Sequence, residues 1–411
     1  MVKRVKSARL WLASATVALA SASGACVVVF GMDPLSEKPA VDGGSLDGGS
    51  LDAKTTDASE ADDAGVCDED DIGEVGKPAV NSPSQGDGGA AFFAVTRLDL
   101  GIDPNADPPG LNLDRRVTAD PATSGCFTSD GGKLVSDPDG GVDNAMFGLL
   151  QELSTLYAAF KPETINQRLA RSYFGFVFRV DEWNRGPDDD SVRVSVFPTI
   201  GYWTTTPQGA HVWDGRDPRV PFDADAGHVW MPDERFKVGT IGSSLRSREA
   251  WISGGRLVAR FDRFTLPLRS SVDELRSFDI ELHDAWLTAS ISPDGAALSE
   301  GLLGGRVRTE AFIRQVALLY NQELSSHLCS AVAFGIGTFC SARDVRASHC
   351  DDGKGIACDA LSFGAGFEAQ HVDGLGPFRS RTDDEYRDAG QVPPWERCPD
   401  LDGGRPIDCK P

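Results

Sequence analysis

Apolar and polar residues alternate along several short segments of this chain. Residues 174–180 place Phe or Val at every second position, and residues 191–196 alternate Val with Ser or Arg. A period of two is typical of a β-strand with one face in a core. The connection between them, residues 181–190, is rich in Asp, Gly and Pro, so we predict an antiparallel hairpin.

Other segments extend this pattern. Further strands are predicted at residues 92–98, 256–264, 278–282 and 286–291, each bounded by Gly, Pro or Asp. Two segments have helical spacing instead, Asp143 to Phe160 and Thr309 to Leu324, each with its first residue as N-cap. The pattern predicts a mainly β fold, an antiparallel β-sandwich or barrel-like domain, with two amphipathic helices packed on the sheet.

Composition divides the chain into regions. Residues 26–88 are rich in Asp, Gly and Ser and repeat one pentad, Asp42 to Leu46 and Asp47 to Leu51, which predicts a disordered tether. Residues 89–327 form the predicted β domain. Residues 328–411 form a disulfide-rich C-terminal region, which belongs to the same domain if the strand-like segment 360–369 joins the sheet.

The N-terminus has the features of an export signal. Basic residues precede an apolar run from Leu10 to Ala20, which is shorter than the ~20 residues needed to span a bilayer, so residues 1–25 are a predicted signal peptide. The sequence Ser23-Gly24-Ala25-Cys26 resembles the lipobox of bacterial lipoproteins, although Ser23 stands where that pattern prefers leucine.

The resemblance implies that Cys26 is lipidated and becomes the mature N-terminus. The partner is then a membrane, reached through the lipid anchor, and Val27 after the cysteine favours the outer membrane of the cell envelope. The alternative is ordinary cleavage after Ala22, which would make the protein a secreted one with Cys26 as a free or paired thiol.

The nine cysteines support lipidation, because setting Cys26 aside leaves an even number. An even set in an exported chain is typical of disulfides. The candidates are Cys67, Cys126, Cys329, Cys340, Cys350, Cys358, Cys398 and Cys409. Proximity predicts that neighbours in this series pair, Cys67 with Cys126 and Cys350 with Cys358 among them. Zinc is the weaker alternative, since no C-x-x-C pair exists and its only hint is His349 beside Cys350.

The charge excludes one class of partner. The formal net charge is −22, and removal of the four basic residues of the signal peptide brings it to −26. Binding to nucleic acid needs a basic surface, so nucleic acid is not a predicted partner. About half of this net charge lies before residue 77, where fourteen Asp and Glu stand against Lys38 and Lys54, so the folded part is only mildly acidic.

Two stretches carry oxygen ligands suited to calcium. The first runs from Asp103 to Asp114, but it has Pro108-Pro109 where calcium loops require glycine. The preferred candidate is the second stretch, whose ligands are Asp137, Asp139, Asp143 and Asn144, because its glycines allow backbone carbonyls to turn inward. A turn followed by an N-cap explains the same residues. No other cofactor is predicted.

Aromatic residues mark a candidate ligand face. Residues 211–213 and 228–230 both read His-Val-Trp, and on a strand residues two apart share a face. Flat indoles with polar neighbours suit sugar rings, so a glycan or another cell-surface molecule is the predicted ligand, with burial in the core as the alternative. The candidate ligand-binding residues are Trp203, His211, Trp213, His228 and Trp230.

Motifs of known chemistry are absent from the sequence. We find no G-x-S-x-G, S-x-x-K, H-E-x-x-H or P-loop sequence. The sequence therefore favours a non-enzymatic binding or structural protein. The alternative is a secreted hydrolase of polysaccharide or cell-wall material, which would use two carboxylates brought ~5 to 9 Å apart by the fold.

Overall fold

A computed structural model of the chain describes residues 77–78, 89–102, 107–114, 126, 141–156, 160–170, 174–205, 211–212, 229–240, 242–269, 277–317, 320–321, 326–327, 336–351 and 357–378. The predicted signal peptide and nearly all of the predicted tether lie outside these residues. Among the described helices, none is long and apolar enough to cross a membrane.

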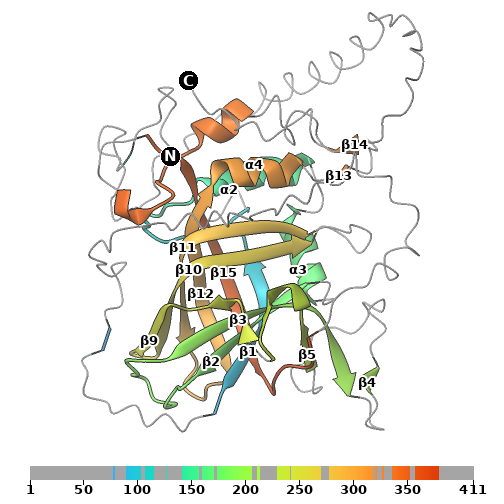
Figure 1. Ribbon diagram of the computed structural model, residues 1–411, viewed down its shortest axis with the longest axis vertical. Helices are drawn as coiled ribbons and strands as arrows, with labels where there is room; N and C mark the ends of the chain where they lie inside the picture. The colour runs from blue at the N-terminus through green and yellow to red at the C-terminus, as the bar shows by residue number, and fades with distance from the viewer. Residues whose placement is uncertain are drawn as a thin grey trace, which may run out of the picture. The chain divides into compact units, whose positions relative to one another are not determined.

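Strands dominate the described part of the chain (Figure 1). They are β1 (Ala91–Asp99), β2 (Gly175–Asp181), β3 (Arg193–Thr205), β4 (His211–Val212), β5 (Val229–Pro232), β6 (Lys237–Val238), β7 (Gly242–Ser243), β8 (Leu245–Arg246), β9 (Glu249–Ser253), β10 (Arg256–Arg269), β11 (Ser277–Ile291), β12 (Ala297–Arg308), β13 (Tyr320–Asn321), β14 (Ser326–His327) and β15 (Ala360–Val372). The helices are α2 (Met146–Leu156), α3 (Pro162–Ala170) and α4 (Thr309–Ala317), with single 3-10 turns η4 (Glu234–Phe236) and η5 (His349–Asp351).

The main sheet has 11 strands in the order β4-β3-β2-β1-β15-β12-β11-β10-β9, with β5 and β8 also paired to β3. All of its pairings are antiparallel.

This sheet closes on itself. Strand β8 pairs with β3, and the Val192 N–H donates to the Ala250 carbonyl of β9 at 3.1 Å. The bridge between Asp189 and Ile252 extends the same seam. The β8–β9 segment therefore joins β3 to β10, and the predicted mainly β, barrel-like fold is confirmed.

Alternation along the strands fills the interior of the closed sheet. Phe176 and Phe178 of β2, Phe261 of β10 and Phe363 of β15 belong to one cluster of buried apolar side chains. This cluster also takes residues from β1, β3, β9, β11 and β12, because every second side chain of each strand points inward. The interior is a packed apolar core.

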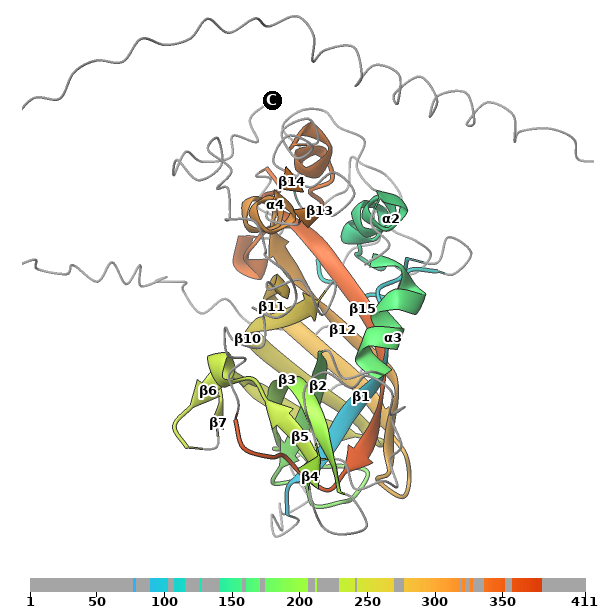
Figure 2. The ribbon, with the colours of Figure 1, turned by 90° about the vertical axis from the view of Figure 1, so that its right-hand side faces the viewer.

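Other elements cover both ends of the closed sheet. Helices α2 and α4 lie at the same end, as Figures 1 and 2 show, and bury Leu150 and Phe312 in the core cluster. At the other end, the loop after β2 buries Trp183, whose indole Nε1 donates to the Gly186 carbonyl at 3.0 Å. Helix α3 lies against β1, where Asn166 exchanges two hydrogen bonds with Leu98.

A second apolar cluster lies on the outer face of β1, β2 and β3. Trp230 of β5 packs there with Phe197 and Val177. The chain after β15 returns over this face, where the Gly376 N–H donates to the Trp230 carbonyl at 2.7 Å. Both faces of β2 are therefore covered by apolar side chains.

The sequence predicted most of these strands but erred at the helices. The segments 278–282 and 286–291 are one strand, β11, and α3 was not predicted. Helix α2 begins at Met146, so Asp143 is not its N-cap; the Asp143 carboxylate accepts from the backbone N–H groups of Leu113 and Asp114 instead. Helix α4 ends at Ala317, before the predicted end.

The C-terminal region joins the same sheet, because β15 pairs with both β1 and β12. A disulfide links Cys126 to Cys358, just before β15, across a sequence separation of 232. The predicted pairs Cys67–Cys126 and Cys350–Cys358 are therefore wrong. The strand order decides which cysteines meet, and proximity along the chain does not.

Candidate functional site

The candidate site starts from a β-bulge in β11. The β11–β12 register shifts between His283 and Trp286, and Asp284 has a φ of 47°. Opposite the bulge, a Cβ on Gly305 would lie 2.9 Å from the Leu282 Cβ, so only glycine fits there. Bulges and left-handed non-glycine residues are frequent at functional sites.

Four side chains meet at this bulge, which we call the Asp284 cluster: Asp284, Arg260 of β10, Arg306 of β12 and His349 of η5. The Asp284 carboxylate accepts from Arg260 at 2.9 Å and from His349 Nδ1 at 2.8 Å. Arg306 Nε lies 3.9 Å away. Three adjacent strands thus supply one charged group each, and η5 adds an imidazole.

Burial and charge keep the central carboxylate ionised. Burial by itself raises the pKa of Asp284. The hydrogen bond from His349 and the neighbouring positive charges lower it by more, so the pKa falls from 3.8 to about 2. Arg260 also stacks over the Trp286 ring at 5.3 Å. The ionised Asp284 can therefore orient the side chains that donate to it, but it cannot act as a general acid near neutral pH.

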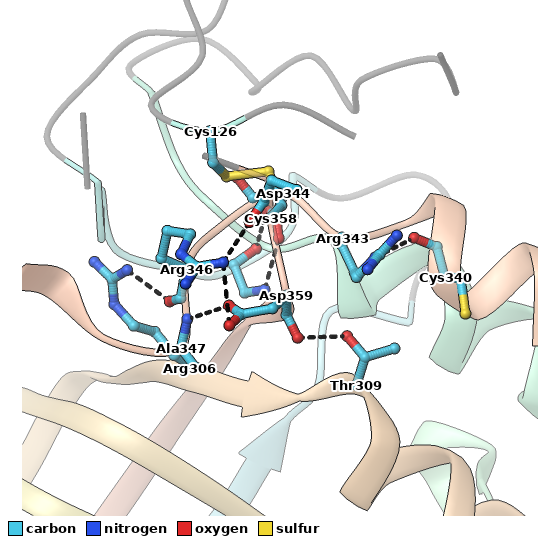
Figure 3. Close-up of a disulfide and its surroundings, with 12 residues drawn as sticks. Cys126, Arg306, Thr309, Cys340, Arg343, Asp344, Arg346, Ala347, Cys358 and Asp359 are labelled. Carbon is cyan, nitrogen blue, oxygen red and sulfur yellow. Dashed lines mark hydrogen bonds and ion pairs between the residues drawn. A yellow bond between two sulfur atoms is a disulfide. The ribbon is translucent and has the colours of Figure 1, made fainter. Parts of the chain in front are cut away.

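Arg306 extends the cluster into the surrounding loops. It donates to the Arg346 carbonyl at 2.8 Å (Figure 3) and to the Leu113 carbonyl at 2.6 Å. Arg346 in turn lies 3.2 Å from the Asp359 carboxylate. The guanidinium groups thus hold two loops, residues 107–114 and 343–351, against the sheet.

The Cys126–Cys358 disulfide lies beside these loops (Figure 3). Cys126 Sγ lies 3.3 Å from the Asp344 carbonyl oxygen. The Asp344 carboxylate accepts from the Ser362 backbone N–H at 2.8 Å and from the Ser362 hydroxyl. The disulfide therefore ties residue 126 to the residues just before β15, and the Asp344 hydrogen bonds tie residues 343–351 to β15 itself.

His349 is the chemically versatile member of the cluster. Its Nδ1 faces Asp284, which orients the ring as carboxylates orient catalytic and metal-binding histidines. Its Nε2 lies 3.4 Å from Arg260 Nη2 and 3.6 Å from Cys350 Sγ. Cys350 is disulfide-bonded, so it is not available as the thiolate ligand of the predicted zinc alternative.

The predicted ligand face is only partly described. Trp203 lies near the end of β3, and His211 of β4 and Trp230 of β5 lie in strands that both pair with this end. Trp230 is 1% exposed in the outer apolar cluster, so its indole belongs to the core. Trp213 and His228 lie outside the described residues.

The predicted calcium ligands take structural positions where they are described. Asp143 is buried and binds backbone N–H groups, while Asn144 donates to the Pro109 and Gly364 carbonyls. Asp137 and Asp139 lie outside the described residues. Over the described ranges, no group of three or more His, Cys, Asp or Glu side chains is placed to hold a metal ion.

The carboxylates of Asp233 and Asp279 share one partner, Arg235. Arg235 pairs with Asp233 at 2.9 Å and with Asp279 at 3.4 Å. The guanidinium lies between the two acids, in the space where a hydrolase needs its sugar and water. This pair therefore does not form the predicted hydrolase site.

Sequence reasoning missed the Asp284 cluster, although one signal was present. Leu282 and Ala285 are both in the core although they are three residues apart, so the period of two slips by one at His283 and Asp284. Such a slip indicates a bulge. No signal in the sequence points to the partners on β10, β12 and η5.

Comparison with protein-family models, with curated proteins and with solved structures finds no match for this chain. Function is therefore inferred from the geometry and from the sequence features above.

Proposed function

We propose that this chain is a lipid-anchored cell-envelope protein whose folded part is a non-enzymatic structural or binding module. The observation that carries the proposal is the closed sheet, whose interior is filled by apolar side chains and whose ends are covered by α2, α4 and the Trp183 loop. A packed interior supports a rigid body that acts through its outer surface.

The buried carboxylates of the described residues also support this proposal. Asp143, Asp189 and Asp233 each accept hydrogen bonds from backbone N–H groups of nearby turns. Asp284 is bound by its cationic neighbours. These contacts assign the acids to holding loops in place, which is a structural role.

The anchor and the tether complete the proposal. Cys26 would carry the lipid, and residues 26–88 would hold the folded module away from the membrane, extended by their own negative charge. Disulfides suit this setting, since they persist in oxidising compartments. The Cys126–Cys358 link stabilises the module chiefly by restricting the unfolded chain.

The rival function, a hydrolase of polysaccharide or cell-wall material, has less support. The Trp230 indole is buried, and Arg235 lies between the carboxylates of Asp233 and Asp279. Glycan or calcium binding as the specific role of the module depends on Trp213, His228, Asp137 and Asp139, and it remains part of the proposal to be tested.

Intact-mass measurement of the protein from native membranes, with and without reduction, tests the proposal. We expect a lipid increment that disappears in Cys26→Ser, and a gain of eight hydrogens on reduction, because eight of the nine cysteines remain. A lipid-free mass corresponding to cleavage after Ala22 would contradict the anchor and favour the secreted hydrolase. Cys67→Ser is the matched control and should keep the lipid.

A further inference from the structure

The segment that follows β15 closes over the outer apolar cluster. Residues 373–378, which we call the strap, leave the end of β15 and run past β5 towards β6 and β7 (Figure 2). Leu375 and Phe378 pack against the buried side chains of this cluster, which include Phe197 and Trp230. The strap therefore covers an apolar surface on the outside of the closed sheet.

The strap lies against β5 as an added strand would. Leu375 forms an isolated parallel bridge with Trp230, and the Gly376 N–H donates to the Trp230 carbonyl at 2.7 Å. The ring centroid of Phe378 lies 6.1 Å from that of Phe197. Backbone pairing at a strand edge, combined with side chains in apolar contacts, is a common way in which proteins bind an extended peptide.

The strap is held less firmly than the strand that it follows. Strand β15 pairs along its length with both β1 and β12, whereas the strap has an isolated bridge. Leu375 and Phe378 are only half-buried, and Pro377 is exposed. Segments with few buried contacts open at a lower free-energy cost than the strands of the core. The strap can therefore leave the surface while β15 stays in the sheet.

The surface under the strap has a polar group that the strap does not use. Thr199 Oγ1 is buried and, among the described residues, has no hydrogen-bond partner. It lies beside Gly175, where a Cβ would be 2.7 Å from this oxygen and 3.1 Å from the Trp230 ring. A buried hydroxyl without a partner destabilises the arrangement that buries it. The closed strap thus leaves a hydrogen-bonding group of this surface unsatisfied.

We propose that the surface under the strap is a binding site for an extended apolar segment of another protein, which adds to β5 in place of the strap. The strap defines what fits: an aliphatic side chain at the position of Leu375 and an aromatic one at that of Phe378. Lys237 Nζ, 5.6 Å from the Phe378 ring, favours the aromatic residue. The inference deepens the proposed binding role, on which it rests, and does not involve the lipid anchor.

A second copy of this chain suits the site less well than a different protein. Exchange of straps between two copies makes the same contacts that each copy already makes internally. It therefore gains nothing that offsets the entropy lost on association. Two copies with a formal net charge of −22 each also repel one another. A different protein that supplies the apolar segment is thus the favoured occupant.

The test uses the full-length mature protein, with a fluorescent peptide of residues 372–378 as the probe and anisotropy as the measurement. In Leu375→Ala/Phe378→Ala the strap loses its two apolar side chains. We expect this variant to bind the peptide about tenfold or more tighter than the wild type, whose own strap competes at a roughly millimolar effective concentration. Equal affinities, or no binding to either protein, would overturn the proposal.

Asp373→Asn is the matched control, because it changes an exposed residue of the strap and keeps both apolar side chains. It should bind the peptide as weakly as the wild type does. A peptide with a photoreactive phenylalanine analogue in place of its phenylalanine should cross-link near Phe197 and Lys237. Cross-links that map only to other parts of the chain would overturn the proposal.

Sedimentation distinguishes a different protein from a second copy. A wild-type dimer that is lost in Leu375→Ala/Phe378→Ala would make the second copy the occupant and overturn the proposal. If the double variant does not fold, hydrogen exchange of the wild type decides. The strap amides should exchange about a hundredfold or more faster than those of residues 361–367, which lie in the ladder with β12. Equal protection of the two segments would mean that the strap does not open, and would overturn the proposal.

Failure of this test is distinct from failure of the lipid anchor. The peptide measurement concerns β5 and the strap, whereas the intact-mass measurement concerns Cys26. A module that binds no peptide but carries the lipid would keep the anchor and lose only the binding site.

Discussion

The interior of the closed sheet and the Asp284 cluster on its wall are held by opposite kinds of interaction. Inside, Phe261 and Phe363 are held by close packing, which is non-directional and tolerates changes of similar volume. In the cluster, Asp284 pairs with Arg260, and the loss of either removes one opposite charge from beside a largely buried charge. The core therefore responds to volume and the cluster to charge and pH.

The largest expected effect tests the core. Phe363→Ala removes a fully buried ring, and we expect the free energy of unfolding to fall by about 3–5 kcal/mol, because transfer and cavity terms add. Denaturant unfolding measures this loss. Val238→Ala, at a site 53% exposed, should change it by less than about 0.5 kcal/mol. Similar losses for both variants would mean that the interior is not the packed core described above.

An intermediate effect tests the cluster through pH. The pKa of Asp284 is lowered from 3.8 to about 2, so its contribution to stability is present above pH 4 and is lost as the pH falls towards 2. The shift corresponds to about 2 kcal/mol. Unfolding of wild type and Asp284→Asn should therefore differ by about 2 kcal/mol less at pH 2 than at pH 5.

The same comparison provides its own control. Other carboxylates titrate in both proteins and cancel in the difference, so only the contribution of Asp284 remains. A difference that stays constant from pH 5 to pH 2 would show that the carboxylate gains nothing from its neighbours. Phe363→Ala should show no such pH dependence, since it changes no charge.

The smallest expected effect separates burial from charge. Arg97 and Glu368 form an ion pair at 3.0 Å with side chains 61% and 53% exposed, in contrast to the buried pair of Arg260 and Asp284. A double-mutant cycle with Arg97→Ala and Glu368→Ala should give a coupling energy below about 1 kcal/mol. A coupling energy of about 2 kcal/mol, equal to the contribution expected of Asp284, would mean that burial is not what strengthens the cluster.

Much of the fold could be predicted from local patterns. The alternation in residues 174–180 and 191–196 predicts β2 and β3, which pair as an antiparallel hairpin. Helical spacing predicts α2 and α4, but both are shorter than the pattern. Asp143 is held by the backbone of residues 113–114, and this tertiary contact overrides the local preference for an N-cap.

The candidate site was far less predictable. The slip in alternation at His283 and Asp284 marks the bulge. The ligand residues that the sequence predicts lie elsewhere, in residues 203–230 and 137–144. Trp230 illustrates the reason, since an indole suits a core as well as a sugar-binding face. Only its position under the chain that follows β15 places it in the core.

The sequence by itself determined the strands and the mainly β class of this protein, because the period of two is a local property of adjacent residues. The closure of the sheet, the Cys126–Cys358 link and the Asp284 cluster were decided only by the tertiary structure. Cys126 and Cys358 are 232 positions apart, and the cluster takes side chains from β10, β11, β12 and η5. Such contacts depend on strand order and register across the whole sheet, which no short segment specifies.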